Sequence, residues 1–238
     1  MVKCLPRAFR FAHAAAKMNA FHDRETPMNA KPAAPIRLHA YPLSGHAHRV
    51  ELFLSLLGLP FEKVDVDLGK GEHKAPEFLA LNPFGQVPVI QDGDVTLADS
   101  NAILTYLALR YDAGGRWLPR DPVGAAQVQR WLSVAAGPLV NGAGNARVNV
   151  LFRRPHDPRC AEIAKTLLGR MESHLAVRDF LAADGPTLAD IALYTYTSHA
   201  PEGGVSLQPY GQVRAWLARI EALPGFVGMP RQAAEEAA

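Results

Sequence analysis

Residues 36–68 change their hydrophobic period twice, and this feature limits the fold more than any other. Residues 36–40 alternate between apolar and polar side chains as a strand does, and apolar residues then recur at helical spacing over residues 47–57. Gly58 ends that helix, and alternation returns over residues 63–68. A strand, a helix and a second strand of these lengths predict a βαβ unit with parallel strands and a right-handed crossover.

Two short apolar runs follow, over residues 87–90 and 95–97, with an Asp-Gly pair between them that predicts a β-hairpin. Pro88 lies inside the first run, although proline lacks the N–H that a strand ladder uses. A cis bond before Pro88 would turn the N–H and C=O of Val87 outward as a free pair. Such a pair can hold an extended, peptide-like ligand by strand-type pairing, and the residues alone leave the isomer open.

The rest of the chain is helical in pattern after a polar linker. We therefore expect an α/β domain joined to an all-α domain. A Gly-Pro pair ending at Pro138 predicts a break or kink in the helical domain, and the following stretch is a poor helix by propensity. Thr187 and Asp190 predict a capping box at a later helix start. The expected boundaries are a disordered or mis-started extension over 1–35, an α/β domain over 36–111, a linker over 112–122, a helical domain over 123–230 and a tail over 231–238.

Composition excludes several classes of protein. The formal net charge is +2, so no global charge directs the chain to nucleic acid or to an anionic membrane. No apolar run is long enough to span a bilayer. The two cysteines are Cys4, in the N-terminal extension, and Cys160, which makes a structural disulfide unexpected and fits a reducing, cytoplasmic location. No Cys-x-x-Cys motif supports disulfide redox chemistry, and we expect no metal site.

Several polar residues stand where elements begin. Asp99 and Ser100 precede a helix, so Ser100 can cap it, or the pair can bind the carboxylate and the ammonium of an amino-acid head group. Ser44 lies in the loop before the first helix, two residues before the helix proper, where its hydroxyl can cap the helix or donate to an anion such as a thiolate. His46 and His48 are either acid-base groups or solvent-facing residues of the first helical turn. His73 and Lys74 are either solvated surface or ligand contacts.

Together these signals resemble the glutathione S-transferase family, in particular bacterial, serine-type members with plant-like glutathione motifs. The resemblance covers residues 36–230 and is carried by "HKAPEFLALNPFGQVPVI", "LADSNAILTYL" and "PTLADIALYTY". It implies a thioredoxin-like first domain, a helical-bundle second domain and a homodimer. It also implies that the co-substrate is reduced glutathione and that the second substrate is a hydrophobic electrophile.

The resemblance also implies a role for each matching residue. Pro88 is expected to be cis, and Val87 to pair with the cysteinyl part of glutathione. Asp99 and Ser100 take the place of the acidic-Ser pair that holds the γ-glutamyl end, although many members carry Glu at the first position. Gln86 supports that end or its neighbour. The remaining implied residues are Ser44 as the thiolate-stabilising hydroxyl and His73 and Lys74 at the glycyl carboxylate.

The resemblance predicts a detoxifying glutathione transferase, and three alternatives stay open on the same site: a glutathione-dependent isomerase, dehalogenase or peroxidase. A non-catalytic scaffold with the same fold is a further alternative. His46 would assist or replace Ser44, whereas Tyr41 ranks below it. The electrophile's pocket should lie between the domains, with Asn141, Asn145 and Arg147 as candidate contacts or as ordinary helix surface.

Overall fold

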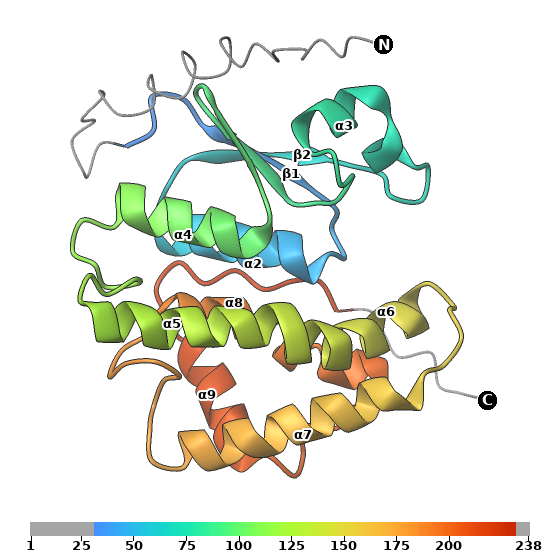
Figure 1. Ribbon diagram of the computed structural model, residues 1–238, viewed down its shortest axis with the longest axis vertical. Coiled ribbons are helices and arrows are strands. Elements are labelled where there is room, and N and C mark those ends of the chain that lie inside the picture. The colour runs from blue at the N-terminus through green and yellow to red at the C-terminus, as the bar shows by residue number, and fades with distance from the viewer. Residues whose placement is uncertain (1–30, 232–238) are drawn as a thin grey trace, which may run out of the picture.

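A computed structural model describes residues 31–231, which form a four-stranded sheet with helices and, below it in Figure 1, a helical bundle. Most of the expected N-terminal extension, including Cys4, lies outside the described residues, and so does nearly all of the expected tail. The elements of the first part are β1 (Ile36–Ala40), α2 (Gly45–Leu56), β2 (Phe61–Asp65), the 3-10 turn η2 (Glu72–Lys74), α3 (Pro76–Leu81), β3 (Val89–Asp92), β4 (Val95–Ala98) and α4 (Ser100–Tyr111).

The βαβ unit expected from the sequence is present, with shifted boundaries. β1 and β2 are parallel, and Ile36 lies opposite Phe61. α2 begins at Gly45 rather than at residue 47, because the hydroxyl of Ser44 accepts a hydrogen bond from the N–H of Ala47 and so caps the helix directly. Gly58, with φ +62°, adopts the left-handed conformation that follows a helix end.

The expected hairpin completes the sheet in the order β2-β1-β3-β4. β3 pairs antiparallel with both β1 and β4, with Ile90 opposite Leu38 on one side and Leu97 on the other. β3 begins at Val89, so Pro88 lies just before the strand rather than inside it, where no ladder hydrogen bond is needed. The Val87–Pro88 bond is cis, as the resemblance implied.

Helices cover both faces of this sheet. α2 and α4 lie on the face turned toward the bundle, and α3 lies on the other face (Figure 1). Phe78 of α3 packs with Val66 and Val89 in a small apolar cluster on its side. The larger core is continuous through both parts of the molecule, and Phe53 of α2 meets Trp117 edge to face at 5.3 Å.

The bundle contains one long helical stretch where the sequence predicted a break or a kink. Its elements are α5 (Pro122–Val134), the π-helix η3 (Ala135–Gly144), α6 (Asn145–Leu151), α7 (Pro158–Leu175), α8 (Leu188–Ser198), the 3-10 turn η4 (Ala200–Gly203) and α9 (Gly211–Glu221). Of the two expected outcomes at Pro138, the break is wrong: the chain continues through it with wider π-type bonding, which accommodates a residue without an N–H. Gly142 is explained by packing: a Cβ there would lie 2.8 Å from the backbone N of Ala164 in α7.

The expected capping box at the start of α8 is present. The Thr187 side chain accepts from the N–H of Ala189, and the Asp190 carboxylate accepts from the N–H of Thr187 at 2.8 Å. Asp190 also accepts from the indole N–H of Trp216 in α9, so one buried carboxylate joins the two helices. Burial raises the pKa of Asp190.

The segment after α9 returns to the first domain and runs between α2 and α8 (Figure 1). Ser55 of α2 donates to the Gly225 carbonyl at 2.6 Å. His48 of α2 donates to the Val227 carbonyl at 3.0 Å, and Arg231 donates to the Ser198 carbonyl of α8 at 3.2 Å. We call residues 225–231 the C-terminal strap. Within the described part of the chain, no helix is long and apolar enough to cross a membrane.

Candidate active site

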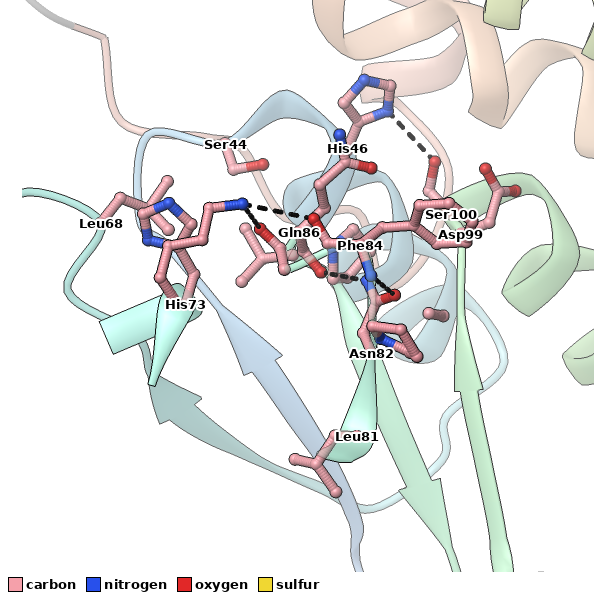
Figure 2. Close-up of a pocket in the computed structure, with 16 residues that line it drawn as sticks. Ser44, His46, Leu68, His73, Leu81, Asn82, Phe84, Gln86, Asp99 and Ser100 are labelled. Atoms are coloured by element: carbon pink, nitrogen blue, oxygen red, sulfur yellow. Dashed lines mark hydrogen bonds between the residues drawn. The ribbon is translucent and has the colours of Figure 1, made fainter. Parts of the chain in front are cut away.

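One pocket of about 820 Å³ lies along the edge of the sheet, and it collects residues from five segments of the first domain. All of the residues to which the resemblance gave a role toward glutathione line it: Ser44, His73, Lys74, Gln86, Val87, Pro88, Asp99 and Ser100. Figure 2 shows His73 on one side and Asp99 and Ser100 on the other, with Ser44 and His46 above them. The pocket is therefore elongated, with chemically different groups at its two ends.

Ser44 is held in a defined position at the N-terminus of α2. Its backbone N–H donates to the Tyr41 carbonyl at 2.9 Å, and its own carbonyl accepts from the N–H of His48 at 2.9 Å. Because the Oγ atom already accepts from the Ala47 N–H at 3.2 Å, its hydrogen is left to donate elsewhere. No described residue accepts that hydrogen, so Ser44 presents a hydroxyl donor to the pocket beside a helix N-terminus.

Val87 carries an unpaired backbone pair in the middle of the pocket. Among residues 31–231, no hydrogen bond is made by its N–H or its C=O. The preceding loop is braced by Asn82, whose side-chain amide donates to the Gln86 carbonyl at 2.8 Å and accepts from the Phe84 N–H at 3.1 Å. The loop is thus fixed while the Val87 pair stays free for a strand-like ligand.

The start of α4 differs from the expectation. Asp99, not Ser100, is the N-cap: its carboxylate accepts from the N–H groups of Asn101 and Ala102, both at 2.9 Å. Asp99 has φ 70°, in a region that L side chains seldom occupy, and residues with such strained backbones cluster at active sites and ligand clamps. Ser100 becomes the first helical residue, so its hydroxyl is not used for capping and is available for other contacts.

A buried cation lies behind Ser100. Arg49 of α2 is 0% exposed, and its Nη1 donates to the Ser100 hydroxyl and to the Asn101 side chain, both at 3.0 Å. Burial lowers the pKa of Arg49 to about 10, which leaves the guanidinium charged at neutral pH. This end of the pocket therefore contains a fixed positive charge and a helix N-terminus, the environment that an anion requires.

His46 completes this end. Its Nδ1 lies 3.2 Å from the Ser100 hydroxyl, and its ring packs edge to face on Tyr196 of α8 with centroids 5.2 Å apart. Burial, assisted by the charge of Arg49, lowers the pKa of His46 to about 3. The imidazole is therefore neutral near pH 7, which makes it a hydrogen-bonding group rather than a general base.

The opposite end of the pocket is exposed and basic. Lys74 donates from Nζ to the carbonyls of Phe84 and Gly85, at 3.3 and 3.2 Å. His73 precedes it in the 3-10 turn η2, and Phe84 is 79% exposed. A long lysine side chain in water positions a ligand less firmly than the buried cation at the other end does.

The candidate contacts on the bundle do not reach this pocket. Asn141 and Asn145 are exposed helix surface. Arg147 is 1% exposed, so it is neither a pocket contact nor ordinary surface, because its guanidinium pairs with Glu202 at 2.6 Å inside the protein. Tyr41 does not line the pocket; its ring lies 6.5 Å from that of Phe152.

Sequence reasoning missed two contributors to the site. Arg49 lies on the buried face of a helix, where an arginine gives no signal until its partner, 51 residues later, is known. Asn82 was visible only as part of the "NPFG" turn, where an Asn that bonds its neighbouring backbone is a recognisable signal. Among the described residues, no group of three or more His, Cys, Asp or Glu side chains could hold a metal ion.

The geometry supports binding of a short, extended, zwitterionic peptide. One end offers a carboxylate, a hydroxyl and a buried cation, the middle offers a free backbone pair, and the other end is basic. In Figure 2 Ser44 lies between His73 and Ser100, where its hydroxyl can donate to a group on the central residue of such a peptide.

Comparisons with known proteins agree with this description. The family model for the N-terminal domain of glutathione S-transferases matches residues 34–109, and the model for their C-terminal domain matches residues 153–224. Glutathione S-transferase 3 of Zea mays is 38% identical over 214 residues, which cover 81% of this chain and 92% of that protein. Human glutathione S-transferase theta-2 is 32% identical over 200 residues, which cover 77% of this chain and 79% of that protein.

Solved structures are also similar over most of their length. A possible glutathione S-transferase from Rhodopseudomonas palustris has a TM-score of 0.77 and 34% identity, covering 84% of this chain and all of that one (100%). A glutathione transferase homologue from Drosophila mojavensis, solved with bound glutathione, has a TM-score of 0.74 and 27% identity, covering 80% and 89%.

Proposed function

This chain belongs to the glutathione S-transferase family of transferase enzymes, and from that premise we propose that it conjugates reduced glutathione to a hydrophobic electrophile. In this reaction the glutathione thiol loses its proton, and the thiolate sulfur forms a bond to the electrophilic carbon as a leaving group departs or a double bond is saturated. The protein supplies position and anion stabilisation, and the nucleophile is the sulfur of the co-substrate.

One observation carries the proposal: the residues expected to bind glutathione, drawn from distant parts of the sequence, line a single pocket around the free backbone pair of Val87. We assign the γ-glutamyl ammonium to the Asp99 carboxylate and the γ-glutamyl carboxylate to Ser100 in front of Arg49. The cysteinyl backbone pairs with Val87, next to Gln86 and the cis Pro88. The glycyl carboxylate then lies at His73 and Lys74.

Ser44 stabilises the thiolate in this assignment. Its hydrogen is free to donate, and it stands at the N-terminus of α2, where negative charge is favoured. Lowering the thiol pKa from about 8.5 to about 6.5 requires about 2.7 kcal/mol of preferential binding to the thiolate. One charge-assisted hydrogen bond supplies about 1.5–3 kcal/mol, so the hydroxyl and the helix terminus together are sufficient.

We also propose that residues 36–111 act as the glutathione-binding domain and residues 123–230 as the helical domain of a cytoplasmic homodimer. In support, Cys160 is a buried free thiol, as expected in a reducing compartment. Light scattering of the purified protein should give the mass of two chains, and a monomer mass would contradict the dimer.

The test is a titration of the bound thiol. Wild-type protein with glutathione should develop thiolate absorbance with a pKa well below 8.5, whereas Ser44→Ala should restore the ordinary value and reduce turnover at pH 6.5 by about 10²-fold. Asp121→Ala, which removes the N-cap of α5 far from the pocket, is the control for losing a cap. The role of Ser44 would be refuted if the pKa of the bound thiol were about 8.5 in the wild-type protein, or if Ser44→Ala had the same thiol pKa as the wild-type protein.

Peroxides, haloalkanes and isomerisable substrates, assayed in parallel with aromatic electrophiles, decide among the reactions that this site can support. A protein that binds no glutathione at millimolar concentration in calorimetry would instead be a scaffold.

A further inference from the structure

Arg147 connects the helical bundle to the loop that carries Ser44. Its Nη1 donates to the carbonyl of Leu43 at 2.8 Å, across 104 residues of sequence. The other hydrogen bonds that fix Ser44 are local, since they involve the neighbouring residues Tyr41, Ala47 and His48. The contact from Arg147 is therefore a restraint on this loop that comes from the other domain.

The restraint acts on a rigid unit. The Leu43 oxygen, the Ser44 nitrogen and the Ser44 Cα lie in one peptide plane. Arg147 holds the oxygen on one side of this plane, and the Tyr41 carbonyl holds the N–H on the other, at 2.9 Å. With both edges of the plane held, the position of the Ser44 Cα is fixed as well, and the Ala47 N–H then holds the hydroxyl oxygen that this Cα carries.

Arg147 is itself held firmly. The guanidinium is 1% exposed, and its Nε donates to Glu202 of η4 at 2.6 Å. A buried arginine needs such a partner, because an unpaired charge inside a protein is strongly destabilising. Gly203 follows Glu202 and lies so close to α6 that a Cβ on it would be 2.6 Å from the backbone nitrogen of Arg147. Glycine at this position therefore allows Glu202 to reach the guanidinium.

A second contact from the bundle supports the same region. Tyr196 of α8 packs against the first turn of α2, where a Cβ on Gly45 would lie 2.7 Å from its ring. The bundle thus approaches both the residue before Ser44 and the residue after it.

We propose that Arg147 is a positioning residue, which acts through the Leu43 carbonyl to aim the Ser44 hydroxyl at the glutathione sulfur. The inference rests on the proposed function. It assigns part of the thiol activation to the helical domain, although none of the residues lining the glutathione pocket belongs to that domain.

The experiment compares three variants of the full-length protein. Arg147→Gln removes the charge and the fork of donors, and Arg147→Lys keeps the charge but offers one ammonium where Glu202 and Leu43 need two directions. Thr195→Val is the matched control: Thr195 is fully buried at the same domain interface and bonds the imidazole of His48 at 2.9 Å, whereas the bond from His48 to Ser44 is made by its backbone N–H, which the substitution leaves in place. Each variant is tested for unfolding midpoint, glutathione affinity, bound-thiol pKa and kcat.

Arg147→Gln should raise the pKa of the bound thiol by about one unit and lower kcat at pH 6.5 about fivefold, with glutathione affinity changed less than about threefold. The thiol pKa and kcat of Arg147→Lys should lie between those of Arg147→Gln and those of the wild-type protein. Thr195→Val should lower the unfolding midpoint without moving the thiol pKa.

Two outcomes overturn the inference. The first is that the bound thiol has the same pKa in the folded Arg147 variants as in the wild-type protein. If Arg147→Gln does not fold, the result for Arg147→Lys is decisive. The other is an equal thiol shift in Thr195→Val, which would reveal a general effect of a loosened interface. If the wild-type protein itself shows no thiol shift, the proposed function fails, and that result is distinct from either of these.

Discussion

The two ends of the glutathione pocket are built differently. At one end, Ser100 is 4% exposed and stands in front of Arg49, which is 0% exposed and makes two hydrogen bonds at 3.0 Å. At the other end, Lys74 is exposed and extends along a loop whose Phe84 is 79% exposed. The buried end is organised before any ligand arrives, whereas the basic end depends on a solvent-exposed side chain that is bonded to two loop carbonyls.

This difference sets an order of expected energies. A hydrogen bond to a charged group away from solvent contributes about 1.5–3 kcal/mol, whereas an exposed ion pair contributes about 0–1 kcal/mol. Affinity and specificity should therefore come mainly from the γ-glutamyl end, and the basic end should act mainly on capture of the ligand at low salt. Four substitutions test this contrast, from the largest expected effect to the smallest.

Ser100→Ala should have the largest effect. It removes the hydroxyl that contacts Arg49 and His46 and leaves part of a buried guanidinium without its partner. We expect glutathione affinity to fall about 30-fold, or about 2 kcal/mol, in calorimetry, with about 1–2 kcal/mol less unfolding free energy. Ser133→Ala, at an exposed serine of α5, is the control. An affinity within a factor of two of wild type would remove the basis for calling this end dominant.

His46→Gln should change how stability depends on pH. Burial lowers the pKa of His46 in the folded protein to about 3. As the pH falls below about 6.5, this histidine is therefore protonated in the unfolded chain but stays neutral in the folded protein. Stability from this group is complete above about pH 6.5 and is lost as the pH falls toward 3. Between pH 8 and pH 5 the wild type should lose about 2 kcal/mol that His46→Gln does not lose.

Denaturant titrations at several pH values measure this difference. His156→Gln, which removes a histidine from an exposed loop, shows what the loss of any histidine does to the slope. Equal slopes in His46→Gln and wild type would mean that His46 is as well solvated as a residue at the exposed end.

Asp99→Asn should weaken glutathione about tenfold, or about 1.4 kcal/mol, because the ammonium loses its carboxylate partner. The amide oxygen can still accept from the N–H groups of Asn101 and Ala102, so the cap and the unfolding free energy should change little. A glutathione analogue without the α-amino group should bind both proteins equally. If it discriminates between them as glutathione does, Asp99 does not bind the ammonium.

Lys74→Gln should have the smallest effect, a loss of about two- to fivefold in affinity at low salt that disappears near 1 M salt. Lys70→Gln, at an exposed lysine paired with Asp67, is the control. A salt-independent loss as large as that of Ser100→Ala would abolish the contrast between the two ends.

The candidate site was largely predictable from sequence because its residues lie at element boundaries. Ser44, Pro88 and Asp99 interrupt clear strand and helix patterns, and such interruptions are visible without a structure. Arg49 and Arg147 were different. Each lies within a helix, and its burial depends on a partner elsewhere, Ser100 or Glu202, that hydrophobic period does not reveal.

The fold shows the same division. The βαβ unit, the hairpin and the Thr187 cap follow from local rules, and the structure has all of them. The continuous helix through Pro138 does not follow, because tertiary packing against α7 at Gly142 stabilises a stretch that local propensity disfavours. The N-cap at Asp99 instead of Ser100 is a shift of one residue, and it changes which hydroxyl is available to a ligand.

The C-terminal strap has a consequence for how the protein is made. Its bonds from Gly225 and Val227 reach Ser55 and His48, residues of the first helix described. During translation the α/β domain leaves the ribosome early and starts to fold, yet these contacts cannot form until residues 225–227 have been synthesised. A nascent chain halted before residue 225 therefore leaves uncovered the surface of α2 that the C-terminal strap contacts, and chaperones can bind there.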